Sequence, residues 1–427
     1  MAKEGDYVVI KTNKEELKGL LLKSKNPEKF VIKLSSGYNT SIYKKDILKI
    51  EKATEEKAQK ELPKIKVTKN PSLRNILIIH TGGTLASKVD YKTGAVSPRF
   101  SNEEIITMFP ELKEIANIES KFFANIFSED MNFIHYNLLA KEVKENISKF
   151  DGIIITHGTD TLHYTSAALS FIFEDLAIPV ILVGAQRSSD RGSSDAFLNL
   201  LAACQFISKS DFSGVAICMH ENMSDDSCVI LPGLKAKKLH TSRRDAFKSI
   251  NVKPIARIKN NEIEILSHDF PKANRLDKNQ LKLKLFNEVK IGILKTHPNM
   301  KKEEISMYSK FDGLILEGTG LGHAPINKID KNTSENDLIF KELEKLSKKI
   351  PVIITSQCIF GRVNLNVYST GRKLQEIGIL GNLSDMTTET AFIKLAWLIS
   401  NYPKDVRKMI DKDLKGEISR RTSEDFL

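Results

Sequence analysis

The chain has 427 residues, 41% hydrophobic and 28% charged, which is typical of a globular protein with two or three domains. No run approaches the roughly 20 apolar residues of a membrane span, and the start of the chain lacks the apolar segment of a signal peptide. These features exclude an integral membrane protein and lead us to expect a cytoplasmic one without membrane contacts. The net charge of +11 is uneven, because residues 1–72 hold 17 Lys and 10 acidic residues.

Residues 5–50 alternate five short apolar runs with polar turns, from YVVIKT to ILKIEK. This pattern predicts a small SH3-like β-barrel over residues 1–50. Residues 51–72 are almost entirely polar and predict a linker. The basic excess of this region allows an RNA-binding patch or a lysine-rich surface, and the scarcity of aromatic residues favours the surface.

The character of the chain changes at Asn75, where long apolar strands begin to alternate with helical patterns. Such alternation predicts an α/β fold with a parallel sheet covered on both faces. A polar stretch at 274–286 separates two α/β domains, at residues 73–272 and 285–403. Residues 404–427 predict an exposed amphipathic helix and a tail.

The four cysteines form no CxxC pair and lie near no histidine cluster, so no metal site is expected. The HExxH and GxSxG motifs are also absent, which weakens a zinc protease or a serine esterase. No nucleotide-binding loop is visible, because the glycines at 82–83 are followed by neither the lysine of a Walker loop nor the spacing of a dinucleotide fingerprint. We therefore expect no cofactor in this chain.

Three predicted strands end in chemically rich turns: HTGGT at 80–84, THGTDT at 156–161 and GAQ at 184–186. Ligands of open parallel sheets collect at such carboxyl ends. Each turn could also be a helix cap or a simple small-residue turn. A hydroxyl nucleophile needs a base, and the basic segment 234–249 offers lysines that could serve. These local patterns leave capping and catalysis open.

Three motifs together resemble type I L-asparaginases, which are two-domain α/β amidohydrolases: TGGTLAS, THGTDTLHYTSAAL and VGAQRSSDRGSSDAFLNLLAA. The resemblance covers about residues 75–403 and implies an asparaginase-like parallel-sheet body behind the small barrel. By this resemblance, Thr84 and Thr159 are the catalytic threonines. Asp160 binds the substrate's α-amino group and orients Lys238, for which Lys235 and Lys237 are the neighbouring alternatives.

The same resemblance implies further contacts with the substrate. Ser128 would bind its α-carboxylate, beside Glu129, where the family often has Gln. The backbone of Ala185 would meet the leaving amide, and Tyr91 is the tyrosine nearest to the position of the family's lid residue. The resemblance also implies a homodimer formed through the asparaginase-like body.

The extension of some 70 residues before the TGGT strand resembles a second group, the D subunits of archaeal glutamyl-tRNA(Gln) amidotransferases. This resemblance implies a glutaminase component that releases ammonia from glutamine or asparagine. A partner, the E subunit of such enzymes, would use ATP and Mg²⁺ to activate Glu-tRNA(Gln), binding most of the tRNA, within a heterodimer or heterotetramer. The alternatives are a free-standing L-asparaginase and an inactive RNA-binding scaffold.

Overall fold

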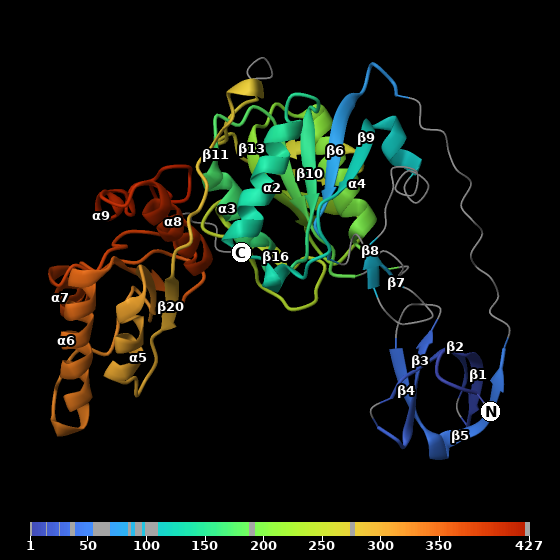
Figure 1. Ribbon diagram of the computed structural model, residues 1–427, viewed down its shortest axis with the longest axis horizontal. Helices are drawn as coiled ribbons and strands as arrows, with labels where there is room; N and C mark the ends of the chain where they lie inside the picture. Colours follow the sequence, from blue (N-terminus) through green and yellow to red (C-terminus); the bar gives the residue numbers. More distant parts are fainter. Residues whose placement is uncertain are drawn as a thin grey trace.

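A computed structural model describes ten segments of the chain (Figure 1). They are residues 2–13, 15–24, 26–34, 39–53, 69–83, 87–89, 96–98, 110–187, 193–273 and 278–422. Two of the predicted site residues, Thr84 and Tyr91, lie outside the described residues.

The N-terminal residues form one antiparallel sheet of five strands, in the order β4-β3-β2-β1-β5. The strands are β1 (Tyr7–Thr12), β2 (Glu16–Leu22), β3 (Lys29–Leu34), β4 (Asn39–Tyr43) and β5 (Ile47–Lys52). Each predicted apolar run therefore forms a strand. Alternate side chains point to one face, where Val8, Ile10, Leu21, Ile32 and Ile42 make a small core.

The largest sheet has eight strands in the order β18-β17-β14-β13-β12-β10-β6-β9. They are β6 (Arg74–His80), β9 (Ala116–Phe122), β10 (Gly152–Thr156), β12 (Pro179–Val183), β13 (Gly214–His220), β14 (Ser227–Pro232), β17 (Ala256–Lys259) and β18 (Glu262–Ile265).

This sheet is mixed, with the predicted parallel strands on one side and antiparallel strands on the other. The five strands from β9 to β13 pair in parallel, whereas β14, β17 and β18 pair antiparallel. Short connections explain the β13–β14 and β17–β18 pairs. Residues 221–226 join β13 to β14, and residues 260–261 join β17 to β18. A parallel crossover needs a dozen or more residues, so these short turns form hairpins.

Helices cover both faces of the parallel strands: α2 (Phe133–Asn146) and α3 (Leu162–Ile172) lie on one face and α4 (Ala196–Lys209) on the other (Figure 1). Strand β6 is apolar from Ile76 to Ile79 because its alternate side chains pack into the cores on opposite faces of the sheet. Its Leu77 and Ile79 join the core under α2 and α3. Its Ile76 and Ile78 join the core under α4. A strand buried on both faces therefore needs no polar alternation.

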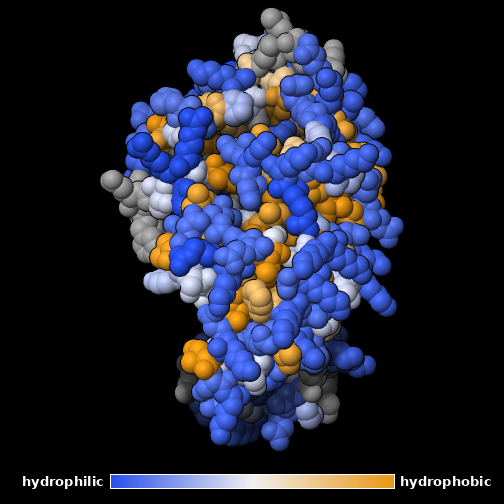
Figure 2. All heavy atoms as spheres, turned by 90° about the vertical axis from the view of Figure 1, so that its left-hand side faces the viewer, coloured by the Kyte–Doolittle hydropathy of each residue, from blue (hydrophilic) through white to orange (hydrophobic). Residues whose placement is uncertain are grey.

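The C-terminal domain is built on a parallel sheet in the order β20-β21-β22. Its elements are β20 (Ile291–Lys295), β21 (Gly313–Gly318), β22 (Val352–Ser356), α5 (Lys302–Ser306), α6 (Ser334–Lys349), α7 (Ser369–Glu376), α8 (Thr388–Asn401) and α9 (Val406–Met409). The face that this domain presents in Figure 2 is largely hydrophilic, with hydrophobic residues in separate groups. No helix in the described ranges is long and apolar enough to cross a membrane.

Short strands form three small pairs beside the main sheets. β7 (Ser87–Val89) pairs with β8 (Val96–Pro98), β11 (Phe173–Glu174) with β19 (Lys282–Leu283), and β15 (Ala236–Lys238) with β16 (Phe247–Ser249). The β15–β16 hairpin matters for the site, because the predicted catalytic lysine is its last residue on β15. The β11–β19 pair ties the connection between the two α/β domains to the end of α3.

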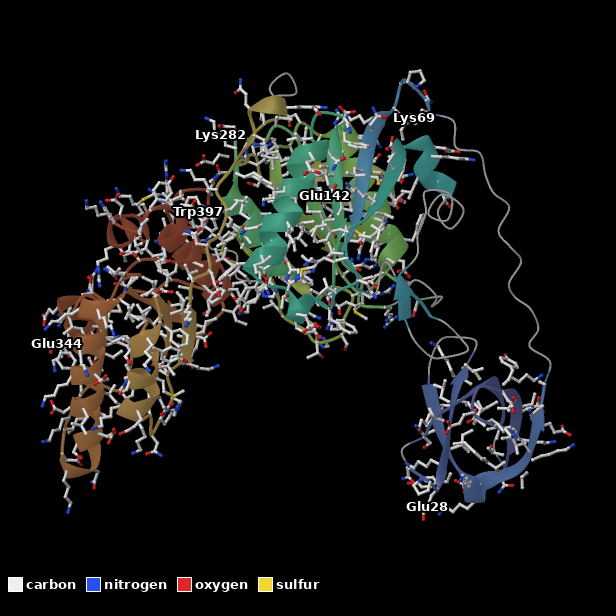
Figure 3. The ribbon with its side chains drawn as sticks, viewed as in Figure 1. Glu28, Lys69, Glu142, Lys282, Glu344 and Trp397 are labelled. Atoms are coloured by element: carbon white, nitrogen blue, oxygen red, sulfur yellow. The ribbon has the colours of Figure 1, made fainter. Side chains whose placement is uncertain are left out.

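Helix α8 joins the two α/β domains. It packs against α3 of the first domain and against all three strands of the second. The ring of Trp397 on α8 lies 5.4 Å from that of Phe171 on α3, and its Nε1 donates a hydrogen bond to the carbonyl of Lys284. Figure 3 shows Trp397 where the two domains meet. Most of α8 is therefore buried, in keeping with its apolar sequence.

The end of the chain differs from the exposed amphipathic helix expected over residues 404–427. Helix α9 has only four residues, and the segment after it folds back onto the body. The carboxylate of Glu417 forms an ion pair of 2.6 Å with Lys394 on α8, and both side chains are fully buried. Lys415 donates to the carbonyl of Phe173 in the first domain. Partners far along the chain thus hold this segment, and the local pattern does not show them.

We expect Glu417→Ala to destabilise the protein by about 3 to 5 kcal/mol, because it leaves the buried Lys394 ammonium without its counter-charge. Chemical denaturation monitored by fluorescence measures the loss. Glu344→Ala, which removes an exposed i,i+4 pair with Lys348 on α6, is the control and should cost at most about 1 kcal/mol. Equal effects of the two substitutions would contradict a structural role for the buried pair.

Candidate active site

Parallel pairing brings the two threonine-rich turns together. In the β6–β10 ladder His80 lies opposite Thr156, so both strands end at the same edge of the sheet. The hydroxyl of Thr81 donates to the carbonyl of Thr156 at 2.8 Å, and Nδ1 of His80 lies 3.0 Å from the Thr156 hydroxyl. The turn that begins at Thr81 is therefore fastened to the end of β10.

Glycine allows these turns to meet backbone to backbone. Gly83 has a φ of +81°, and a Cβ there would lie 2.6 Å from the backbone nitrogen of Gly158. A Cβ on Gly158 would in turn lie 2.9 Å from Cβ of Ser128. Any side chain at either position would push the segments apart. Three segments distant in sequence thus converge at one point, which is where we expect a small substrate to bind.

Lys238 reaches two of the other predicted site residues. Its Nζ donates to the hydroxyl of Thr159 and to Oδ1 of Asp160, both at 2.8 Å. The Lys238 side chain is 10% exposed, whereas that of Asp160 is 67% exposed. The two neighbouring lysines point elsewhere, since Lys235 pairs with Asp385 and Lys237 with Glu389. An ammonium, a hydroxyl and an accessible carboxylate are therefore in direct contact.

Ser128 and Glu129 lie on the short turn that Gly158 touches. Ser128 is buried, and its hydroxyl is 3.3 Å from Oε2 of Glu129, which is exposed. The hydroxyl of Thr161 donates to the carbonyl of Ser128 and fixes this turn to the one that carries Thr159. Ala185 is buried two residues after the end of β12, the strand next to β10. The described residues of the predicted site therefore lie at one edge of the sheet.

Sequence reasoning missed the residues that fix the Ala185 turn. Asp195, fully buried, accepts hydrogen bonds from the backbone N–H groups of Gln186 and Arg187, each at 2.9 Å. Asn199, one helical turn further along α4, donates to the carbonyl of Gly184. The available signal is the motif SSDAFLNL, in which Asp195 and Asn199 stand four residues apart where an apolar helical pattern begins.

Histidines beneath the turns are buried and neutral. Burial lowers the pKa of His80 and of His157 to about 4. Nε2 of His157 lies 2.8 Å from the hydroxyl of Thr165 on α3, and its Nδ1 lies 2.7 Å from the carbonyl of Gly158. His157 is therefore a hydrogen-bonded core residue that supports the turn.

All four cysteines lie in the described part of the chain, and none of them forms a disulfide. Cys204, Cys218 and Cys228 are buried, and Cys358 is exposed. Burial raises the pKa of Cys204 to about 12, so its thiol stays protonated. Among the described residues, no group of three or more His, Cys, Asp or Glu side chains is placed to hold a metal ion.

Comparison with known proteins reveals close relatives over nearly the whole length. The chain is 41% identical to the D subunit of the glutamyl-tRNA(Gln) amidotransferase of Methanosphaera stadtmanae, over 99% of this chain and 95% of the relative. It belongs to the family of glutamyl-tRNA(Gln) amidotransferase D subunits. The D subunit of the Pyrococcus horikoshii enzyme is 42% identical, over 92% of this chain and 88% of its own.

Family models divide this chain into three matched regions: the GatD N-terminal domain at residues 2–52, the asparaginase N-terminal domain at 75–270, and the glutaminase/asparaginase C-terminal domain at 290–410. Among solved structures, the thermostable L-asparaginase of Thermococcus kodakarensis matches with a TM-score of 0.71 and 29% identity, over 81% of this chain and 99% of its own. L-asparaginase I of Vibrio cholerae matches with a TM-score of 0.70 and 28% identity, over 82% and 100%. The predicted family and the asparaginase-like two-domain body are confirmed.

The buried histidines predict a loss of stability in acid. Between pH 6.5 and pH 4 the unfolded chain takes up protons that the folded chain excludes, so each such histidine costs about 2 kcal/mol at pH 5. We expect the Tm to fall between pH 7 and pH 5, and His157→Gln to reduce that fall. Calorimetry at the two pH values measures both. A fall of the same size in His157→Gln would show that His157 does not contribute.

Proposed function

We propose that this chain is the glutaminase component of a tRNA-dependent amidotransferase, the enzyme that converts Glu-tRNA(Gln) to Gln-tRNA(Gln). The observation that carries the proposal is the contact of Lys238 with Thr159 and Asp160 at the edge where the glycine turns meet. Membership of the D-subunit family supports it. Glutamine or asparagine would be the donor of ammonia.

The first half of the reaction forms an ester. The hydroxyl of Thr84 or of Thr159 attacks the side-chain amide carbon of the substrate, and the proton of that hydroxyl must pass to a base. In its neutral form, the Lys238 amine can accept a proton from Thr159 over the 2.8 Å contact. The tetrahedral intermediate then breaks its C–N bond, and the departing nitrogen takes up the proton and leaves as ammonia.

The second half regenerates the enzyme. Water attacks the ester carbon, the threonine oxygen leaves and is reprotonated, and glutamate or aspartate is released. Asp160 has the exposure needed to receive the α-ammonium group of the substrate while it holds Lys238. Ser128, at the contact of the three segments, would bind the α-carboxylate. The backbone at Ala185, fixed through Asp195, would meet the leaving amide.

The remaining chemistry belongs to a partner. An E subunit that uses ATP and Mg²⁺ would activate Glu-tRNA(Gln), bind most of the tRNA and capture the ammonia. The asparaginase-like bodies of two copies of this chain would associate as a homodimer, to give a heterotetramer with two partner subunits. The naming of the relatives as subunits of an amidotransferase supports a complex. Such a reaction would take place in the cytoplasm, where tRNA is aminoacylated.

Substitutions at the site should abolish ammonia release and leave the fold intact. We expect Thr84→Ala, Thr159→Val and Lys238→Met each to reduce kcat by at least about a hundredfold, because each removes a nucleophile or a proton carrier. A coupled ammonia assay measures the rate, and circular dichroism checks the fold. Lys295→Met, which changes a largely exposed lysine on β20, is the control. A near-normal rate in any of the three variants would show that the site is assigned wrongly.

Coupling to the partner separates an amidotransferase component from a free-standing asparaginase. We expect the chain together with the E subunit to release ammonia from glutamine faster when Glu-tRNA(Gln), ATP and Mg²⁺ are all present. The comparison is the same mixture without tRNA, and the chain alone. Rapid hydrolysis of asparagine that is indifferent to the partner and to tRNA would contradict the proposal and favour the asparaginase alternative.

A further inference from the structure

The strand that carries Lys238 is held by the opposite domain. Strand β15 and the two residues before it contact residues 385–390, which lead into helix α8 of the C-terminal domain and form its first turn. We call residues 385–390 the α8 lead segment. Three contacts join the two: the Thr390 hydroxyl donates to the Leu234 carbonyl at 2.9 Å, Lys235 pairs with Asp385 at 2.7 Å, and Lys237 pairs with Glu389 at 2.6 Å.

These contacts are shielded from water. The side chains of Lys235 and Asp385 are each 1% exposed, and those of Lys237 and Glu389 are 22% and 13% exposed. Buried ion pairs hold their geometry more tightly than exposed ones, because breaking one leaves an uncompensated charge. The paired strand β16 belongs to the same hairpin. The α8 lead segment is thus an anchor for β15 that comes from outside the hairpin.

Strand alternation links the anchor to the chemistry. Successive side chains of a strand point to opposite faces, so Lys237 reaches the C-terminal domain while Lys238 reaches Thr159. A shift of Lys237 therefore moves Lys238 directly. Glu389 lies in the first turn of α8, where a carboxylate is favoured by the helix dipole. Burial is the largest single influence on Glu389 and raises its pKa. The charge and hydrogen bond of Lys237, together with smaller contributions from His163 and a backbone hydrogen bond, still bring that pKa below the usual range.

We propose that Glu389 of the C-terminal domain is a positioning residue for Lys238. Through its pair with Lys237 it fixes β15 so that the Lys238 amine meets the Thr159 hydroxyl, and it neutralises the positive charge next to that amine. The buried pair of Lys235 with Asp385 and the Thr390 hydrogen bond fix the same strand. The inference rests on the proposed function, since it assigns Lys238 the proton transfer.

The charges around Lys238 determine the expected direction of the pH effect. Asp160 contacts Lys238 from the turn after β10, and His163 lies among Glu389, Lys237 and Lys238 from helix α3. Burial lowers the pKa of His163 to about 4, so it is neutral at working pH. Tyr164 on α3 and Glu317 on β21 also lie near this region. Lys248 on β16 is opposite Lys237 in the hairpin, and its ammonium donates to the carbonyl of Glu221. Loss of Glu389 therefore leaves one additional positive charge beside Lys238.

The decisive variant is Glu389→Gln, which keeps the shape and a hydrogen-bond acceptor but removes the charge. We expect kcat for ammonia release from glutamine to fall on the order of tenfold, with KM within twofold because Glu389 lies outside the substrate contacts. The acid limb of the kcat profile should move to lower pH by about one unit, since a second positive charge is disfavoured beside an unpaired Lys237. The value of kcat and its pH profile are measured with the complex of this chain and the E subunit, at a temperature below the Tm of both the wild type and the Glu389→Gln variant.

Three further variants distinguish the effect of Glu389 on the position of Lys238 from the effect of its charge. In Lys237→Met/Glu389→Gln the net charge is restored, so the acid limb should return to its wild-type pH while kcat stays low. Thr390→Val changes no charge but removes the hydrogen bond that Thr390 donates to Leu234 and the one that it accepts from Thr387, so it should lower kcat without moving the limb. Glu344→Gln on α6, whose side chain points away from the first domain in Figure 3, should change neither. A Glu389→Gln enzyme with wild-type kcat and acid limb would overturn the proposal.

Failure of the proposed function would be recognised separately. If Thr159→Val released ammonia as fast as the wild type, the assigned chemistry would be wrong, whatever Glu389 does. The position of Lys238 has a readout without turnover, which is its ε-¹³C resonance followed against pH in the wild type and in Glu389→Gln. A difference between the two titrations supports the anchor, and identical titrations overturn it.

Discussion

The parallel pairing of β6 with β10 is the constraint on which the rest of the site depends. It places the ends of two apolar strands at one edge of the sheet, with His80 opposite Thr156. The turns that follow can then approach to the distance at which only glycine fits, at Gly83 and Gly158. A sheet with another strand order would separate the same motifs, and two threonine-rich turns would remain two ordinary helix caps.

A second constraint is that the site depends on both α/β domains. The turns and strands of the first domain supply the residues that meet the substrate in our proposal. The C-terminal domain supplies α8, whose first turn contacts β15 and whose later turns pack against α3. Because α3 begins directly after Thr161, one helix of the second domain supports both sides of the Lys238–Thr159 contact. The buried end of the chain adds to this through Glu417 and Lys394 on α8.

Much of the architecture could be predicted, because its signals are local. The five N-terminal strands, the apolar strands from β6 to β22 and the change of character at Asn75 follow from periodicity and composition. The antiparallel part of the main sheet, strands β14, β17 and β18, could not be predicted from those signals. Apolar runs such as the one in β14 carry no mark of strand direction, and only the short turn at 221–226 settles it. The local pattern of the tail predicts an exposed helix, because it does not show the contacts with Lys394 and Phe173 that bury the segment.

The sequence by itself indicated the family, the two threonines predicted as nucleophiles, and the glycine-rich and threonine-rich turns that carry them. These features depend on residue type and short spacing. The sequence left three lysines, at 235, 237 and 238, as possible partners of the threonine. The tertiary structure decided between them, since strand alternation and two carboxylates of the C-terminal domain direct each lysine to a different place. These contacts join residues about 80 to 150 positions apart in the chain. They depend on how the sheets and domains pack, which a local sequence pattern does not show.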